Sequence, residues 1–308
     1  MIAVERLTKR YGTMVALDRV TFEVPRGEVF GFVGPNGAGK TTTMRILAAL
    51  LEPTDGRAFV DGVDVDAHPD LVHQRLGYMP DFFGVYDQLT ASEYLDFYAA
   101  CYRLPRARRQ TTVGELLELV GLSDRRNQPV DTLSRGLKQR LCLARALVHD
   151  PAVLLLDEPA SGLDPRARVE MREILRELQR MGKTIVISSH ILPELTELCS
   201  MIGIIDQGRM RATGPVKEVV ARLSSARRVR IHVLGKRDEA LQALRAMPEV
   251  QHADEVDGEL SVAYDGDERA AASVLQRLVT AGVSVSSFTI SDGGLEGAFL
   301  HATSEDPA

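Results

Sequence analysis

One short segment constrains this chain more than any other: glycines alternate with small residues between an apolar run and a stretch with helical spacing. The apolar run spans residues 29–33, and the sequence after it is Gly34-Pro35-Asn36-Gly37-Ala38-Gly39-Lys40-Thr41, followed by Thr42. Glycines let backbone N–H groups turn inward around an anion, and a helix that begins at Lys40 adds about half a positive charge at its N-terminus. The segment fits the P-loop pattern, so we predict a strand, a phosphate-binding loop and a helix in this order.

The end of this segment supplies side chains that suit a triphosphate with a metal ion. The ammonium of Lys40 can reach the β- and γ-phosphates, and the hydroxyl of Thr41 can bind Mg²⁺. A chance match to the glycine pattern would lack the strand and the helix that flank this one. We therefore predict a nucleoside triphosphate site.

Two adjacent carboxylates, Asp157 and Glu158, follow a second apolar run at 153–156. In open α/β sheets ligands bind at the carboxyl ends of the strands, and successive residues of a strand point to opposite sides. Asp157 can therefore hold the hydrated metal while Glu158 orients or deprotonates the attacking water, which predicts hydrolysis. His190 follows a third run, at 184–189, where it can donate a hydrogen bond to a phosphate oxygen.

A second anion site is predicted where another helix begins. Ser134 is placed to cap this helix, and an apolar stripe follows at Leu141, Ala144 and Leu147. A helix N-terminus with a serine and Gly136 exposes donors to a phosphate. The alternative, a capped helix that only packs on its neighbours, stays open at this point.

The order of the apolar runs predicts two domains in the 308 residues. In residues 1–215 apolar runs without alternation take turns with helical stretches, which is typical of a parallel sheet covered on both faces, and antiparallel strands are expected at 21–24 and 57–60. After a linker at 216–226, residues 227–308 have the βαββαβ pattern of a small α+β ferredoxin-like domain.

Composition excludes several classes of protein. A net charge of -6 and a pI of about 5.7 give no basic field, so nucleic acid is not expected as a partner. Cys101, Cys142 and Cys199 form no CxxC or Cys/His cluster, which favours reduced thiols. We find neither a signal peptide nor an apolar run of roughly 18 to 20 residues. We therefore expect a cytoplasmic protein whose role at a membrane depends on a partner.

These motifs together resemble the nucleotide-binding domains of ABC transporters over residues 1–215. In that family an aromatic residue at the place of Tyr11 stacks on adenine, and the segment 34–42 matches the Walker A loop. Asp157 and Glu158 match the Walker B aspartate and the catalytic glutamate, and His190 matches the switch histidine. The resemblance implies an ATPase that uses ATP and Mg²⁺, on a P-loop fold of ABC type with a mixed sheet and a helical subdomain at about 85–150.

The resemblance also implies a dimer. Segment 133–139 matches the family's signature, and segment 161–164, with Ser161 and Asp164, matches its D-loop. In the family the signature of one domain closes over the ATP on the Walker A loop of the other. The signature residues that would act in this way are Ser134, Arg135, Gly136 and Leu137. The implied partners are a second copy or a paralogous ATPase subunit, and transmembrane permease subunits that place the chain on the inner face of the cell membrane.

Three residues depart from the family pattern, one in the Q-loop and two in the signature. Asp81 stands where the Q-loop usually has glutamine, and a carboxylate can bind Mg²⁺ but cannot donate a hydrogen bond. Arg135 and Leu137 replace the common glycine and glutamine of the signature. These residues, and the ending at 295–300, resemble exporter-type subunits that carry a C-terminal accessory domain.

Aromatic residues gather directly after Asp81. Phe82, Phe83 and Tyr86 lie in a glycine-containing loop, where exposed aromatic side chains are unfavourable unless a partner covers them. We predict that this loop receives the coupling helix of the membrane subunit.

Three alternatives stay open at this point. A soluble ABC ATPase that acts on nucleic acid or ribosomes would carry a long insertion or a second ATPase, and no insertion or repeat lies between Lys40 and Ser134. A nucleotide switch that hardly hydrolyses is suggested by Asp81, although Glu158 and His190 favour hydrolysis. An importer subunit would differ only in its partners.

Overall fold

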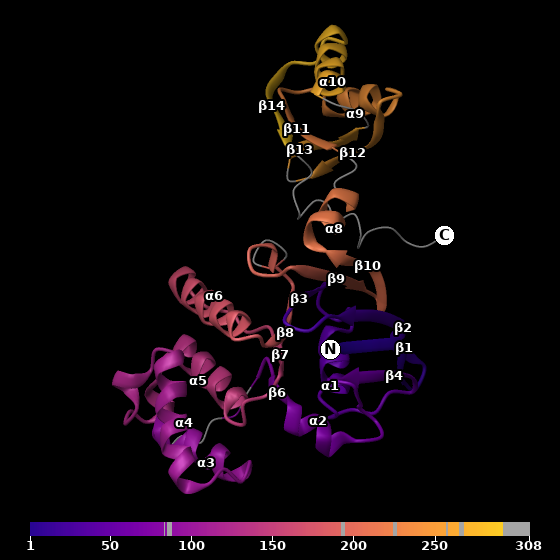
Figure 1. Cartoon of the computed structure of the whole chain (residues 1–308). Coiled ribbons are helices and arrows are strands. Elements are labelled where there is room, and N and C mark those ends of the chain that lie inside the picture. Colours follow the sequence, from indigo (N-terminus) through magenta and orange to yellow (C-terminus); the bar gives the residue numbers. More distant parts are fainter. Residues whose placement is uncertain are drawn as a thin grey trace. The chain divides into compact units, whose positions relative to one another are not determined.

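The structure is a computed structural model that describes residues 1–82, 84, 88–191, 195–223, 227–256, 258–264 and 268–291. The chain divides into two compact units, Met1–Val216 and Lys217–Ala308. Figure 1 shows both units along the chain. Each unit has a hydrophobic core of its own.

The main sheet of the first unit has six strands in the order β10-β9-β3-β8-β7-β6. The strands are β3 (Val29–Val33), β6 (Leu76–Met79), β7 (Val153–Asp157), β8 (Thr184–Ser189), β9 (Met201–Asp206) and β10 (Arg209–Pro215). All neighbours pair in parallel except β10, which is antiparallel to β9. Every residue of β3, β7 and β8 is buried, as expected for central strands that are covered on both faces.

A second, antiparallel sheet of the first unit has the order β2-β1-β4-β5. Its strands are β1 (Ile2–Tyr11), β2 (Met14–Val24), β4 (Asp55–Val60) and β5 (Val63–Asp64). The ring of Phe22 from β2 stacks on Phe30 from β3, with 5.1 Å between centroids. The two sheets therefore share one core, and the mixed α/β fold predicted from the sequence is confirmed.

The helices of the first unit fall into two groups in Figure 1. Helices α1 (Lys40–Leu47) and α2 (Pro69–Arg75) contact strands of both sheets, whereas α3 (Ala91–Cys101), α4 (Arg106–Leu119) and α5 (Arg135–Leu147) pack on one another and α5 also contacts β6. Helix α6 (Pro165–Arg180) follows β7 in the chain. Two short 3-10 turns, Ser123–Arg125 and Val130–Thr132, join α4 to α5. Helix α3 begins with a capping box, in which Thr90 accepts from the Glu93 N–H and the Glu93 carboxylate accepts from the Thr90 N–H. No helix in the described part of the chain is long and apolar enough to cross a membrane.

The second unit begins within helix α8 (Val216–Leu223), so most of the segment expected as a linker is helical. Valines at 216, 219 and 220 and Leu223 recur at helical spacing, which explains the helix. The elements that follow are β11 (Arg227–Val233), α9 (Arg237–Arg245), β12 (Val250–Val256), β13 (Glu259–Tyr264), α10 (Glu268–Thr280) and β14 (Val285–Ser291). They form an antiparallel sheet in the order β12-β13-β11-β14, with the βαββαβ sequence of elements.

Packing in the main sheet generates a stability prediction at Gly203 of β9. A Cβ atom there would lie 2.5 Å from Cζ of Phe30, whose ring is fully buried in the aromatic stack. We expect Gly203→Ala to lower the free energy of unfolding by about 1–3 kcal/mol, because the ring must shift. Gly114 in α4 is the matched control, since a Cβ there meets nothing within 4 Å and Gly114→Ala should stabilise by about 0.5–1 kcal/mol. Urea unfolding followed by circular dichroism measures both, and equal stability of the two variants would contradict the packing.

Candidate active site

The candidate site forms where three neighbouring parallel strands end. Strands β3, β8 and β7 are adjacent, and their carboxyl ends deliver the glycine loop, His190 and the Asp157–Glu158 pair to the same edge of the sheet. The register is explicit: Val33 lies opposite Ser189, and Ser188 lies opposite Asp157. The parallel sheet therefore brings together residues that are far apart in the sequence.

At each end of the glycine loop a glycine packs too closely on a neighbouring residue to leave room for a side chain. A Cβ atom on Gly34 would lie 2.3 Å from the carbonyl oxygen of Ile205, and one on Gly39 would lie 2.6 Å from Cδ2 of Leu17. Gly39 also has φ of 109°, in the left-handed region, where it precedes helix α1. The N–H groups at the start of α1 thus open toward the loop, as a phosphate site requires.

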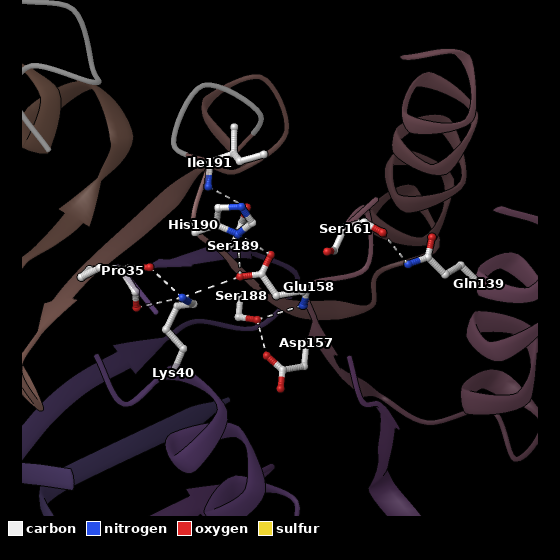
Figure 2. Close-up of polar contacts among 11 residues, drawn as sticks. Pro35, Lys40, Gln139, Asp157, Glu158, Ser161, Ser188, Ser189, His190 and Ile191 are labelled. Carbon is white, nitrogen blue, oxygen red and sulfur yellow. Dashed lines mark hydrogen bonds and ion pairs between the residues drawn. The ribbon is translucent and has the colours of Figure 1, made fainter. Parts of the chain in front are cut away.

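Lys40 is held in the loop by carbonyl oxygens and by one carboxylate. Its Nζ donates to the carbonyl of Gly34 at 2.6 Å and of Pro35 at 3.2 Å, and lies 3.6 Å from Oε1 of Glu158 (Figure 2). The side chain is only 6% exposed. Burial lowers the pKa of Lys40, and the nearby carboxylates of Glu158 and Asp157 oppose that shift. A further anion would stabilise this ammonium.

Asp157 is buried with one free oxygen. Its Oδ1 accepts a hydrogen bond of 2.5 Å from the Ser188 hydroxyl, and its Oδ2 has no hydrogen-bond partner in the described part of the chain. A buried, unpaired carboxylate oxygen fits a metal ligand. No group of three or more His, Cys, Asp or Glu side chains among the described residues could hold a metal ion alone. A Mg²⁺ ion at Asp157 would thus depend on phosphate, hydroxyl and water oxygens for its other ligands.

Glu158 and His190 form a pair at the same edge. Nδ1 of His190 lies 3.0 Å and 3.1 Å from the two carboxylate oxygens of Glu158, as Figure 2 shows. This contact leaves Nε2 of the exposed His190 ring available to a ligand. Glu158 has φ of 50°, a left-handed conformation that is uncommon outside glycine and that costs of order 1–3 kcal/mol. Its backbone N–H is held by Ser188, through the hydroxyl at 3.0 Å and the carbonyl at 3.2 Å.

A hollow of about 520 Å³ joins these groups to the surface. Asp81 lines it together with the glycine loop, Glu158 and His190, so the predicted metal ligand lies in the same hollow as these groups. Tyr11, which is 46% exposed, lies on its wall beneath the ammonium of Lys9, 5.3 Å from the ring centroid. The sequence-predicted residues on its wall are Tyr11, Pro35, Asn36, Gly37, Gly39, Lys40, Thr41, Thr42, Asp81, Glu158, Ser161 and His190. Met14, Val15 and Ala16 also line it, and no motif pointed to them.

The signature residues lie elsewhere on the unit. Ser134 caps helix α5 by accepting from the Leu137 N–H at 3.4 Å, and none of the residues 134–137 lines the hollow at Lys40. Instead α5 contacts the segment after Glu158: Gln139 Nε2 donates to the Ser161 carbonyl at 3.1 Å, and a Cβ on Gly162 would lie 2.5 Å from Cζ of Arg135. Asp164 caps α6 by accepting from the Ala167 N–H at 2.8 Å.

Of the three aromatic residues in the predicted docking loop, the structure describes one. Phe82 is 88% exposed, whereas Phe83 and Tyr86 lie outside the described residues. Sequence analysis did not identify Ser188 as a site residue, because its contacts with Asp157 and Glu158 depend on the register between β7 and β8.

The glycine loop, buried lysine, free aspartate oxygen and glutamate–histidine pair define a P-loop ATPase. The ABC transporter family model matches residues 17–161. The linearmycin resistance ATP-binding protein LnrL of Bacillus subtilis is 32% identical over 307 residues, 98% of each chain. The daunorubicin/doxorubicin resistance ATP-binding protein DrrA of Streptomyces peucetius is 37% identical over 96% of this chain and 90% of its own.

Solved structures agree with this result. An ATP-binding subunit of an ABC transporter is 31% identical with a TM-score of 0.66, over 72% of this chain and 92% of its own. A dimeric ATP-binding cassette in a post-hydrolysis state, bound to ADP and Pi, is 26% identical with a TM-score of 0.64, over 70% of this chain and 99% of its own. The chain belongs to the ATP-binding proteins of the ABC transporter family, and it is an ATPase.

The environment of Lys40 generates a prediction about ligand-dependent stability. ATP at about 100 times its Kd should stabilise the wild-type chain by about 2.7 kcal/mol, and Lys40→Met should lose this stabilisation because the phosphates lose their cation. We expect the ligand-free variant to melt at no lower temperature than the wild type, because burial already disfavours the Lys40 ammonium. Thermal unfolding with and without ATP checks both statements. An ATP-dependent rise in the melting temperature of Lys40→Met would contradict the phosphate role.

Proposed function

We propose that this chain is the ATP-hydrolysing subunit of an ABC exporter, in which ATP with Mg²⁺ joins two ATPase subunits and hydrolysis lets them separate. The observation that carries the proposal is the Glu158–His190 pair, held beside Lys40 and Asp157 at one edge of the main sheet. The Glu158 carboxylate is held by the His190 imidazole, next to the buried ammonium of Lys40, which an anion would stabilise. This arrangement suits the activation of water beside a γ-phosphate.

The contacts of each site residue indicate its role in the proposed reaction. Lys40 exchanges its carbonyl contacts for the β- and γ-phosphates, whose full charges make stronger acceptors. The hydroxyl of Thr41 and the free Oδ2 of Asp157 would hold Mg²⁺, with Asp81 as a further oxygen ligand. Bound there, the ion would supply positive charge that neutralises the phosphates. Glu158, released from Lys40, orients or deprotonates the water, and the His190 N–H that faces Glu158 in the structure turns to donate to a phosphate oxygen.

The proposed dimer rests on where the signature lies. Ser134, Arg135, Gly136 and Leu137 do not line the hollow of their own chain, so their N-terminal donors are available to the nucleotide of a second subunit. A structurally similar cassette is described as dimeric with ADP and Pi bound, which supports the same arrangement here. The second subunit is another copy of this chain or a paralogous ATPase subunit.

Export is supported by the relatives. Two are named for resistance to linearmycin and to daunorubicin/doxorubicin, and another, the Nod factor export ATP-binding protein I of Ralstonia nicotianae, is 40% identical over 71% of this chain. These names favour an exporter over an importer and over a soluble ATPase that acts on nucleic acid. Glu158 paired with His190 disfavours a switch that hardly hydrolyses. For the second unit we propose the ferredoxin-like class of accessory domain, on the basis of its strand order.

The proposed partners are transmembrane permease subunits, which would hold the chain at the cytoplasmic face of the membrane. Two apolar surfaces suit their docking. One is the exposed ring of Phe82. The other is a hollow of about 200 Å³ whose wall includes Leu50, 59% exposed, and the rings of Tyr98 and Tyr102. Exposed aromatic and aliphatic side chains around a hollow are typical anchors for a partner helix.

Blocking hydrolysis should trap the proposed dimer. We expect purified Glu158→Gln to elute as a dimer in size-exclusion chromatography with ATP and Mg²⁺, and as a monomer with ADP. Adding Ser134→Arg should abolish the dimer, because a bulky cation at the cap of α5 blocks closure, while binding of ATP to each monomer continues. A dimer that survives Ser134→Arg, or that forms equally with ADP, would exclude closure through the signature.

The docking proposal predicts a separate effect on assembly. Phe82→Ala and Leu50→Ala should each cost about 2 kcal/mol at the interface, which weakens binding to the permease about 30-fold, if these side chains are anchors. The ATPase rate of the isolated chain should not change. Met181→Ala, at an exposed residue after α6, is the control. Recovery of each variant with the permease in detergent measures the effect, and recovery equal to that of the control would rule out the docking surface.

A further inference from the structure

Ser188 lies at the centre of the polar contacts in Figure 2, although it belongs to none of the sequence motifs. It is the fifth residue of β8 and is fully buried, so it has no access to a nucleotide or to water. Its hydroxyl donates to Oδ1 of Asp157 at 2.5 Å and accepts from the backbone N–H of Glu158 at 3.0 Å. The buried Ser188 side chain therefore contacts both Asp157, the proposed metal ligand, and Glu158, the residue proposed to activate water.

The hydroxyl acts on Asp157 by selecting which oxygen stays free. A serine hydroxyl has one donor, and this donor is used on Oδ1. Oδ2 is then left as the buried oxygen without a partner, and the rotation of the carboxylate is fixed by the hydrogen bond. Outer contacts of this kind hold metal-binding carboxylates in one orientation.

On Glu158 the same residue acts through the backbone. The hydroxyl and the carbonyl of Ser188 both accept from the Glu158 N–H, at 3.0 Å and 3.2 Å. Glu158 has a left-handed backbone, with φ of 50°, which an ordinary strand residue would not keep without such support. This turn sends the Glu158 side chain toward His190 and Lys40, away from the side of the strand on which Asp157 lies.

We propose that Ser188 is a positioning residue for ATP hydrolysis: it aims the free oxygen of Asp157 at the metal and holds Glu158 at the angle at which it meets the water. The proposal rests on the roles proposed above for Asp157 and Glu158. Ser188 contacts neither substrate nor metal and acts only through these two residues. A purely structural hydroxyl, which merely satisfies a buried carboxylate, would affect stability without changing metal binding.

The test is Ser188→Ala, with metal binding measured apart from activity. We expect binding of Mn²⁺ in the presence of a non-hydrolysable ATP analogue, followed by electron paramagnetic resonance, to weaken about 10-fold or more, as is typical when an outer contact of a metal ligand is lost. The kcat should fall about 10- to 100-fold. Binding of ATP in EDTA should stay within about twofold of the wild type, because the glycine loop and Lys40 are untouched.

Two further variants separate positioning from structure. Ser188→Thr keeps the hydroxyl and should restore most of the metal affinity. Thr184→Val removes another fully buried hydroxyl of the same strand, which accepts from the Gly27 N–H at 2.8 Å at the opposite end of β8. It should lower the melting temperature and leave the Mn²⁺ affinity unchanged. Wild-type Mn²⁺ affinity in Ser188→Ala, or an equal loss in Thr184→Val, would overturn the proposal.

Asp157→Asn distinguishes failure of this proposal from failure of the proposed function. If Asp157→Asn weakens Mn²⁺ binding and Ser188→Ala does not, Ser188 has no positioning role and the function stands. If neither variant weakens Mn²⁺ binding, Asp157 is not the metal ligand, and the role of Ser188 fails with it.

Discussion

The parallel pairing of β3, β8 and β7 is the constraint on which the site depends. Side chains of a strand alternate between its two faces, so a slip of one residue in any of these ladders would turn a catalytic side chain to the wrong side of the sheet. All three strands are buried along their whole length, so such a slip would also disturb the packing on both faces of the sheet. The phosphate loop, the two carboxylates and His190 all lie at the carboxyl ends of these strands.

The site that results is held in a state that favours ligand binding. Lys40 has a lowered pKa because it is buried, Asp157 keeps an oxygen without a partner, and Glu158 has a left-handed backbone. Each feature is unfavourable in the absence of ligand, and in the proposed site each would be relieved or used when phosphates and a metal bind. Because these groups are already in place, little reorganisation remains for the moment of reaction. The stacked rings of Phe22 and Phe30 and the two joined sheets supply the packing that keeps such a site rigid.

How far the sequence predicts this structure depends on whether a feature is local. The glycine loop, the two carboxylates and His190 are each signalled by a short motif at the end of an apolar run, and the structure brings them together. The contacts of Ser188 cannot be predicted in this way, because they depend on the register of two strands whose residues are 31 positions apart. The packing of Arg135 on Gly162 likewise joins two motifs that are separate in the sequence.

A chain of short contacts connects Glu158, the proposed catalytic residue, to the signature segment of the same subunit. The Ser161 N–H donates to the Glu158 carbonyl at 3.0 Å, the Ser161 carbonyl accepts from Gln139 at 3.1 Å, and Gln139 lies one turn into α5, the helix that Ser134 caps. In the proposed dimer this signature contacts the nucleotide of the other subunit. A change at Glu158 during hydrolysis would then displace the group that holds the second nucleotide, and binding of that nucleotide would in turn bias Glu158, because coupling between two binding sites is reciprocal. The contacts through Gln139 and the proposed closure would together connect the two proposed nucleotide sites.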